Sequence, residues 1–236
     1  MEIKKIKTIF VSSSIIVVAI ASLLFFPISS PAAFLDFYMD NIHPSDVSIS
    51  YLGGNTPLIG ADISVDTVIG MDTSQNNGVM KNITDGILSF RTGEFSGSGS
   101  YYWAFGPGGI IKLTGWIDLD GDNIKDLNEP KGILFIGTFI ATYVYKIGDT
   151  FDVVFSGFSD AKNPQLTAYY GLPNSPYQGI MALSFFGDGS PPGSLTSSTV
   201  LYGDIVNSSP IPAPQTILLL GSGLLGLIGL RRKFKK

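Results

Sequence analysis

The chain has 236 residues, of which 44% are hydrophobic and 14% are charged, and it contains no cysteine. Eight of the 15 basic residues and one of the 19 acidic residues lie in the terminal segments, so residues 33–210 carry 7 basic and 18 acidic side chains, a net charge of −11. Such an acidic region repels phosphate backbones, which argues against nucleic-acid binding, and without cysteine its stability must come from a hydrophobic core or bound ions.

Residues 1–32 have the layout of a secretory signal peptide. Three lysines precede an apolar run that ends near Phe26, and small residues follow, with Ser30 and Ala32 at the two positions that signal peptidase reads. We therefore expect export, with cleavage after Ala32. An uncleaved membrane anchor is the alternative interpretation.

Residues 33–206 are predicted to form one all-β domain. Apolar and polar residues alternate with period two, as in 61–68, and Val, Ile, Phe, Tyr and Thr are frequent between turn residues. This pattern predicts an antiparallel β-sandwich or jelly-roll-like domain, flanked by an N-terminal signal helix and a C-terminal transmembrane helix. The remaining strand candidates are residues 47–51, 86–92, 109–117, 132–145, 150–158, 180–186 and 198–206.

Three stretches are predicted to lie outside these strands. Residues 33–45 are expected to form either a short opening helix or an irregular lead-in. Residues 190–198 contain two prolines among serines and glycines and are expected to form a loop. Residues 207–211 are expected to link the domain to the tail.

One acidic stretch, WIDLDGDNIKDLNEP, has the spacing of a calcium loop. With Asp118 as position 1, acidic residues occupy positions 1, 3, 5, 9 and 12, and position 7 would donate a backbone carbonyl. The predicted ligands of a structural Ca²⁺ are Asp118, Asp120, Asp122, Ile124, Asp126 and Glu129. The stretch resembles the calcium loops of EF-hands, dockerins and thrombospondin-type repeats, although the flanking residues indicate strands. The alternative is a solvated acidic turn.

Aromatic residues are concentrated at 101–103. Tyr101, Tyr102 and Trp103 are candidates for stacking on sugar rings, and burial in the core of the domain is the alternative. Catalytic patterns are weaker. His43 is the only histidine, and no Ser-His-Asp arrangement forms around it, so we predict that the protein is not an enzyme and has no catalytic residues.

The C-terminal tail combines three features in order. These are the Pro-x-Pro motif Pro212-Ala213-Pro214, an apolar stretch that ends at Leu230, and a basic cluster at 231–236. The 14 residues of 217–230 would extend about 21 Å as a helix, which is short for a bilayer core of about 30 Å. The basic cluster should hold this end in the cytoplasm. A plain single-span anchor is the alternative.

This tail resembles the PEP-CTERM sorting signal of bacteria that produce exopolysaccharide, with Ala213 where the family usually has Glu. The resemblance implies that residues 212–236 insert transiently into the membrane and that an exosortase, a membrane protease, processes the chain near Pro212. It also implies a destination at the cell surface or in the extracellular matrix.

Two functions follow as hypotheses. The first is an exported structural or adhesive component of the exopolysaccharide (biofilm) matrix, stiffened by calcium and in contact with extracellular polysaccharide. The second is a secreted carbohydrate-binding module or a weak glycan-active enzyme that uses the same export route.

Overall fold

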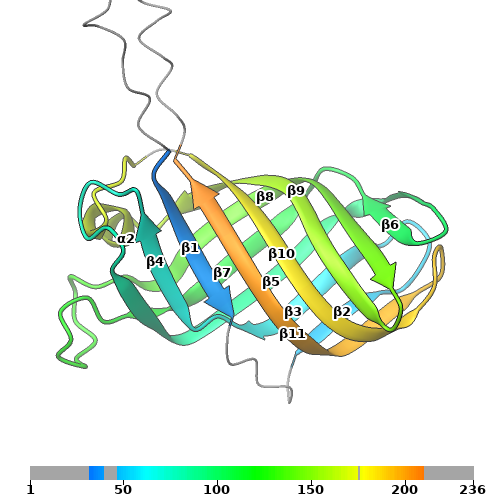
Figure 1. Ribbon diagram of the computed structural model, residues 1–236, viewed down its shortest axis with the longest axis horizontal. Coiled ribbons are helices and arrows are strands. Elements are labelled where there is room, and N and C mark those ends of the chain that lie inside the picture. Colours follow the sequence, from blue (N-terminus) through cyan, green and yellow to red (C-terminus); the bar gives the residue numbers. More distant parts are fainter. Residues whose placement is uncertain (1–31, 40–46, 175, 210–236) are drawn as a thin grey trace, which may run out of the picture. The chain divides into compact units, whose positions relative to one another are not determined.

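The computed structural model describes residues 32–39, 47–174 and 176–209. In this part of the chain, 11 β-strands and one short helix follow one another (Figure 1). They are β1 (Phe34–Met39), β2 (Ser48–Tyr51), β3 (Pro57–Ser64), β4 (Thr67–Met71), β5 (Met80–Ser98), β6 (Tyr102–Phe105), β7 (Gly108–Ile117), β8 (Lys131–Ile147), β9 (Thr150–Lys162), α2 (Pro164–Tyr169), β10 (Tyr177–Gly189) and β11 (Leu195–Ser208).

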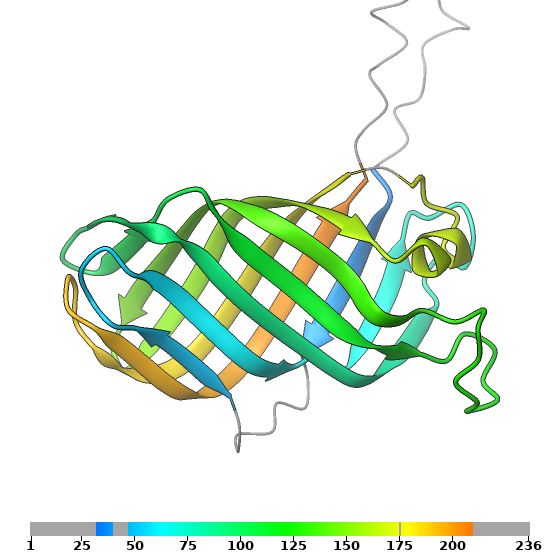
Figure 2. The same ribbon diagram turned by 180° about the vertical axis from the view of Figure 1, so that it is seen from behind.

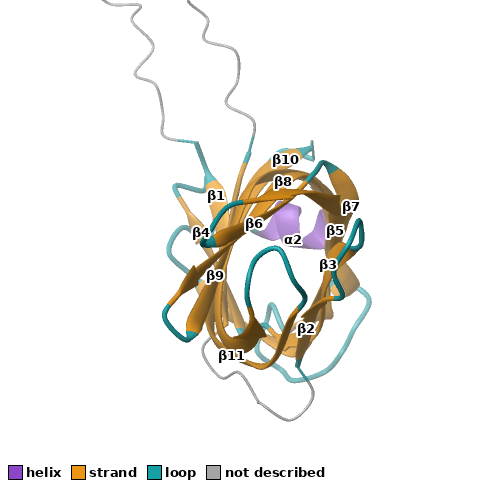
Figure 3. Ribbon diagram, turned by 90° about the vertical axis from the view of Figure 1, so that its right-hand side faces the viewer, coloured by secondary structure: helices purple, strands orange, loops and turns teal. Residues whose placement is uncertain are grey.

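The strands form one antiparallel sheet that closes on itself. One circuit of pairings runs β1-β11-β10-β9-β8-β7-β5-β4 and returns to β1. Toward the other end, β2 and β3 fill the interval between β11 and β5, and β6 fills that between β5 and β8. Figures 1 and 2 show the opposite walls of this sheet, and Figure 3 shows it end-on. The long strand β5 contributes to both ends of the sheet because it changes partners along its length, from β4 and β7 to β3 and β6.

Alternating burial explains why these residues form strands. In β10, Met181 and Leu183 are buried, whereas the alternating Ile180 and Ala182 are exposed. A period of two places every second side chain on the inner face, where the apolar residues are removed from water. The sequence pattern therefore determines which face of each strand turns inward.

Aromatic side chains from opposite walls meet inside the closed sheet. The ring of Phe37 on β1 lies 5.3 Å from that of Phe135 on β8, between centroids. At the other end, the Tyr51 ring on β2 lies 5.2 Å from that of Phe105 on β6. Contacts of this kind fill the interior with side chains, so the two walls pack against each other as the two layers of a sandwich do.

Helix α2 covers one end of the closed sheet (Figures 1 and 3). Asn163 caps it by accepting a hydrogen bond of 2.9 Å from the Gln165 amide, and Leu166 is buried in the core. The following Tyr170 donates its hydroxyl to the Val79 carbonyl at 2.9 Å. Its ring fills the space above Gly70, where a Cβ would lie only 2.2 Å from the Tyr170 Cδ1 atom.

The all-β, antiparallel prediction is confirmed, and the two predicted layers are opposite walls of one closed sheet. The alternative of an opening helix at 33–45 is wrong for its described part, because Phe34–Met39 is a strand bonded on both sides. The predicted strand 61–68 is divided between β3 and β4. The predicted loop 190–198 ends early, since β11 begins at Leu195, and β11 continues through Ser208 into the predicted linker.

The predicted signal helix and the predicted transmembrane helix lie outside the described residues, as does His43. Within the described ranges, no helix combines the length and the apolar character needed to cross a bilayer.

Candidate functional site

The acidic loop lies between two strands, as its flanking sequence predicts. It connects β7 to β8, and the pairing of Trp116 with Lys131 closes its base. In Figure 2 the loop, coloured green, extends from the same end of the sheet as α2. The Gln165 side chain of α2 donates to the Leu127 carbonyl at 2.7 Å, so the helix and the loop support each other.

Aspartate side chains shape the first half of the loop. Asp118 accepts hydrogen bonds from the amides of Gly121 and Asn123, at 2.6 Å and 2.9 Å. These bonds require a reversal of the chain, and both Gly121 (φ 89°) and Asn123 (φ 59°) adopt the left-handed backbone that permits it. Asn123 thus provides the turn at position 6, where calcium loops usually have glycine.

Glu129 anchors the second half of the loop to the sheet. Its side chain is 2% exposed, and Oε2 accepts a hydrogen bond of 2.6 Å from the Trp116 indole nitrogen. Oε1 accepts a second bond of 2.8 Å from the Leu119 amide. These donors hold the buried carboxylate in a fixed position at the base of the loop.

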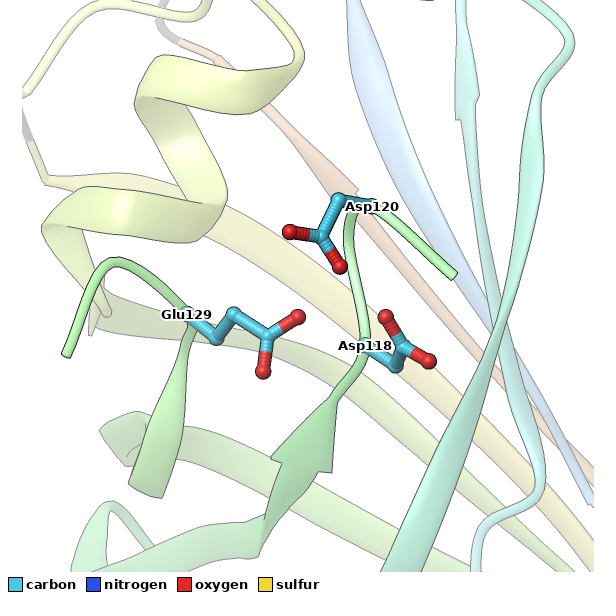
Figure 4. A group of neighbouring side chains, drawn as sticks. All are labelled: Asp118, Asp120 and Glu129. Atoms are coloured by element: carbon cyan, nitrogen blue, oxygen red, sulfur yellow. The ribbon is translucent and has the colours of Figure 1, made fainter. Parts of the chain in front are cut away.

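Three carboxylates converge at this base, as Figure 4 shows. One oxygen from each of Asp118, Asp120 and Glu129 lies within 4.8 Å of the others. The other two predicted acidic ligands instead accept bonds within local turns: Asp122 from the Ile124 amide and Asp126 from the Asn128 amide, each at 2.7 Å. The structure therefore brings together three of the six predicted ligand residues.

The charges around this group are uneven. The Asp122 amide acts to lower the pKa of Asp120, but desolvation and the repulsion from Asp122, Glu129 and Asp118 outweigh it, so this pKa is raised. Desolvation acts to raise the pKa of Asp118, yet the hydrogen bonds from the Asn123 and Gly121 amides hold it below its ordinary value. The three carboxylates concentrate negative charge, which is the environment that a hard cation prefers.

The predicted aromatic group divides between the core and the surface. Trp103 is fully buried, its indole nitrogen donates to the Gly193 carbonyl at 2.8 Å, and it cannot stack on a ligand. Tyr101 is 73% exposed and Tyr102 is 36% exposed. The Tyr102 ring lies 6.4 Å from the ring of Tyr143 and 5.9 Å from that of Tyr145, between centroids.

Tyr143 and Tyr145 were not among the predicted residues, although their signal was present. They stand two apart in the predicted strand 132–145, so they share one face of it. The pairing of Tyr102 with Tyr145 joins β6 to β8 and forms a surface of three adjacent tyrosines. We call Tyr102, Tyr143 and Tyr145 the tyrosine face.

The predicted sorting motif, Pro212-Ala213-Pro214, lies outside the described residues. A family model for the PEP-CTERM protein-sorting motif matches residues 210–233, which include these three residues and the apolar stretch. No curated protein and no solved structure is significantly similar to the chain. The motif implies that the protein is exported, is anchored transiently in the membrane and is processed by exosortase, a membrane protease. The chain therefore carries a PEP-CTERM protein-sorting motif, which follows the closed β-sheet domain in the sequence.

Proposed function

We propose that the β-domain works at the cell surface or in the extracellular exopolysaccharide matrix, as a structural or adhesive component without catalytic activity. The observation that carries this proposal is the sorting motif at residues 210–233. It follows a domain that uses a filled, closed sheet rather than disulfides for stability. In a closed sheet most backbone groups are paired with neighbouring strands, which limits unwanted strand addition in a crowded matrix.

Cell fractionation tests the location. Epitope tags are placed on both sides of Pro212, and the protein is followed in strains with and without exosortase. We expect the upstream tag outside the cell and separated from the downstream tag only where exosortase is present. Both tags on one intact membrane polypeptide in both strains would contradict the proposal and would indicate a plain anchor.

We also propose that Ca²⁺ stiffens the acidic loop. The side chains that support this are Asp118, Asp120 and Glu129, each of which places one oxygen within 4.8 Å of the others. A bound Ca²⁺ would relieve the repulsion that raises the pKa of Asp120. The remaining predicted ligands, Asp122, Ile124 and Asp126, would join by rearrangement of the exposed part of the loop. Affinity in the range of extracellular modules, about 10⁻⁴ to 10⁻³ M, would suit this environment.

A thermal titration tests the calcium site. The melting temperature of the purified protein should rise with Ca²⁺ and level off at saturation, because only the folded loop binds the ion. Asp120→Ala should abolish the rise. The matched control is Asp188→Asn, which removes a charge from an exposed site on β10 and should leave the rise intact. An equal response in all three proteins would disprove a site in the loop.

A second candidate function, polysaccharide binding, is favoured by the tyrosine face. Tyr102, Tyr143 and Tyr145 are 36%, 36% and 41% exposed, and aromatic rings offer apolar faces to the C–H groups of sugars. The double variant Tyr102→Ala/Tyr145→Ala should lose binding to matrix polysaccharide in a pull-down, whereas Tyr101→Ala on the adjacent turn should retain part of it. Retention of full binding by the double variant would exclude this face.

A further inference from the structure

A buried polar triad of Asp160, Lys162 and Asn207 lies on the inner face of the sheet. The Asp160 and Lys162 side chains are both fully buried, and the Lys162 Nζ atom is 2.5 Å from Asp160 Oδ2. The other carboxylate oxygen, Asp160 Oδ1, accepts a hydrogen bond of 2.8 Å from the Asn207 side-chain nitrogen. One carboxylate therefore holds an amine and a carboxamide at the same time.

The triad spans three strands, and a glycine in the middle strand makes this possible. Asp160 and Lys162 belong to β9, Asn207 belongs to β11, and β10 runs between them. Gly179 of β10 is paired with Asn207, and a Cβ at this position would lie 2.4 Å from the Asn207 side-chain nitrogen. The missing side chain leaves the route across β10 open for the carboxamide.

The surroundings of the triad are aromatic. The Lys162 Nζ atom lies 4.6 Å, 5.2 Å and 5.8 Å from the ring centroids of Tyr177, Phe135 and Phe37. An apolar enclosure disfavours charged forms. Burial lowers the pKa of Lys162 to about 8, although Asp160 opposes this shift, and burial raises the pKa of Asp160 despite its two partners.

The side-chain carbonyl oxygen of Asn207 is the remaining polar atom of the triad. Asn207 Oδ1 is buried and has no hydrogen-bond partner within the described part of the chain. A buried acceptor without a donor is unfavourable. Asp160 contacts the nitrogen of the same carboxamide, and its protonated form carries an O–H that could serve as the donor. The enclosure thus shifts the amine toward its neutral form and the acid toward its protonated form, and Asp160 contacts both the amine and the carboxamide.

We propose that Lys162 and Asn207 become joined by an intramolecular isopeptide bond, with Asp160 as the catalytic residue. The neutral Lys162 amine attacks the side-chain carbonyl carbon of Asn207, and the protonated Asp160 stabilises the developing oxyanion by hydrogen bonding. Asp160 then transfers a proton from the amine nitrogen to the leaving nitrogen. A carbon–nitrogen bond to Lys162 forms, the bond to the Asn207 side-chain nitrogen breaks, and one molecule of ammonia leaves. No atom is oxidised or reduced, and Asp160 is regenerated.

The position of this bond suits an exported chain that has no cysteine. Asn207 is near the end of β11, and the sorting motif begins at residue 210. Tension applied through the C-terminal tail would therefore reach β11 first. A covalent link from Asn207 to Lys162 would carry that tension into β9 and keep the last strand from peeling away.

Mass spectrometry of the full, exported chain tests the proposal. We expect the peptide that contains Lys162 and the peptide that contains Asn207 to be recovered as one branched species. Its mass should equal the sum of the masses of the two peptides minus that of one ammonia. Lys162 should resist trypsin in this species. Fragment ions should locate the link between the two side chains.

Variants separate the link from other losses of ammonia. Asp160→Ala and Lys162→Arg should each yield the two peptides separately at unreduced mass. Lys146→Arg is the matched control, because the Lys146 side chain also makes a hydrogen bond, to the Gly189 carbonyl, but lies outside the triad. This variant should remain linked. Gly179→Ala should reduce the linked fraction, because its methyl group would displace the carboxamide.

Two results would overturn the proposal. The first is recovery of separate Lys162 and Asn207 peptides at full mass from the folded wild-type chain. The second is a loss of ammonia within the Asn207 peptide alone, without a branched species, which would identify a succinimide at the asparagine.

Discussion

At the scale of single residues, burial decides what each aromatic or acidic side chain can do. Trp103 and Tyr102 are neighbours on β6, yet the first is fully buried and the second is 36% exposed. Strand geometry sends successive side chains to opposite faces, so one belongs to the core and the other to the tyrosine face. Adjacent residues of the same chemical class therefore have different roles, and substitutions should separate them.

Trp103→Ala should destabilise the domain rather than remove a ligand contact. The substitution leaves a cavity beside Phe151, whose ring centroid is 5.8 Å away, and it deletes the bond to the Gly193 carbonyl. The expected loss of unfolding free energy is about 3–5 kcal/mol. Tyr101→Ala, at an exposed position, should stay within about 0.5 kcal/mol of wild type. Chemical denaturation measures both, and equal stability of the two variants would contradict the assignment of Trp103 to the core.

Asp204 should make stability depend on pH. Burial, followed by the neighbouring Asp36 carboxylate, raises the pKa of Asp204 to about 7 from an ordinary value of 3.8. The folded state therefore binds this proton more tightly than the unfolded state does. The resulting stabilisation is complete below the unfolded pKa and is lost as pH rises through about 7.

Urea denaturation at about pH 5 and about pH 8 checks this dependence. Asp204→Asn cannot release the proton, so its unfolding free energy should fall less than that of the wild type between the two pH values. Asp188→Asn serves as the control for the loss of one negative charge and should follow the wild type. A steeper fall in Asp204→Asn than in the wild type would reverse the sign and refute the argument.

At the scale of elements, the loop between β7 and β8 depends on a buried carboxylate as well as on any cation. Glu129 satisfies two donors, the Trp116 indole and the Leu119 amide. Asp120 lies at an exposed position and accepts a local bond from the Asp122 amide at 3.2 Å. One carboxylate holds the loop to the sheet, and the other is available to a ligand.

Glu129→Ala should therefore destabilise the domain even when a chelator removes calcium. Two donors at the base of the loop lose their acceptor, and each group left unsatisfied costs about 1–3 kcal/mol. Asp120→Ala should change stability little under the same conditions. Denaturation in the presence of chelator distinguishes the two, and a large effect of Asp120→Ala there would show that its role does not require the cation.

The sequence predicts the elements better than their assembly. Strands β7, β8 and β9 could be predicted because their alternation and their Ile, Val, Phe and Tyr content are local signals. The pairing of β1 with β11 could not be predicted, since it joins the two ends of the domain and has no local pattern. Residues 33–45 were ambiguous because a single short apolar stretch fits a helix or a strand.

The candidate site shows the same division. Spacing predicted the place of the acidic loop, but it could not show that Glu129 turns inward onto Trp116. The buried triad left no signal at all. Asp160 and Lys162 look like solvent-exposed charges in a strand, and Asn207 falls in a stretch with the composition of a linker. Only the three-dimensional pairing of β9, β10 and β11 brings them together.

At the scale of the whole molecule, closure of the sheet depends on its first strand. β1 pairs with β4 on one side and β11 on the other, and the Ala33 carbonyl accepts a bond of 2.9 Å from the Ser209 amide. The strand begins directly after the predicted signal-peptide cleavage site. Processing at Ala32 would therefore leave the strand intact, whereas cleavage several residues later would open the sheet.

A chain that lacks Phe34–Met39 should associate or aggregate. Its β4 and β11 would each present an unpaired edge. Phe135 would lose its contact with Phe37, and the apolar inner face around it would be exposed to water. Size-exclusion chromatography and binding of a hydrophobic dye should both report the change. The matched control is Phe37→Ala, which loses a core ring but keeps the backbone of β1. It should be less stable than the wild type yet elute as the wild type does. A monodisperse truncated chain without dye binding would show that the sheet closes without β1, and it would remove the link between the cleavage site and the integrity of the fold.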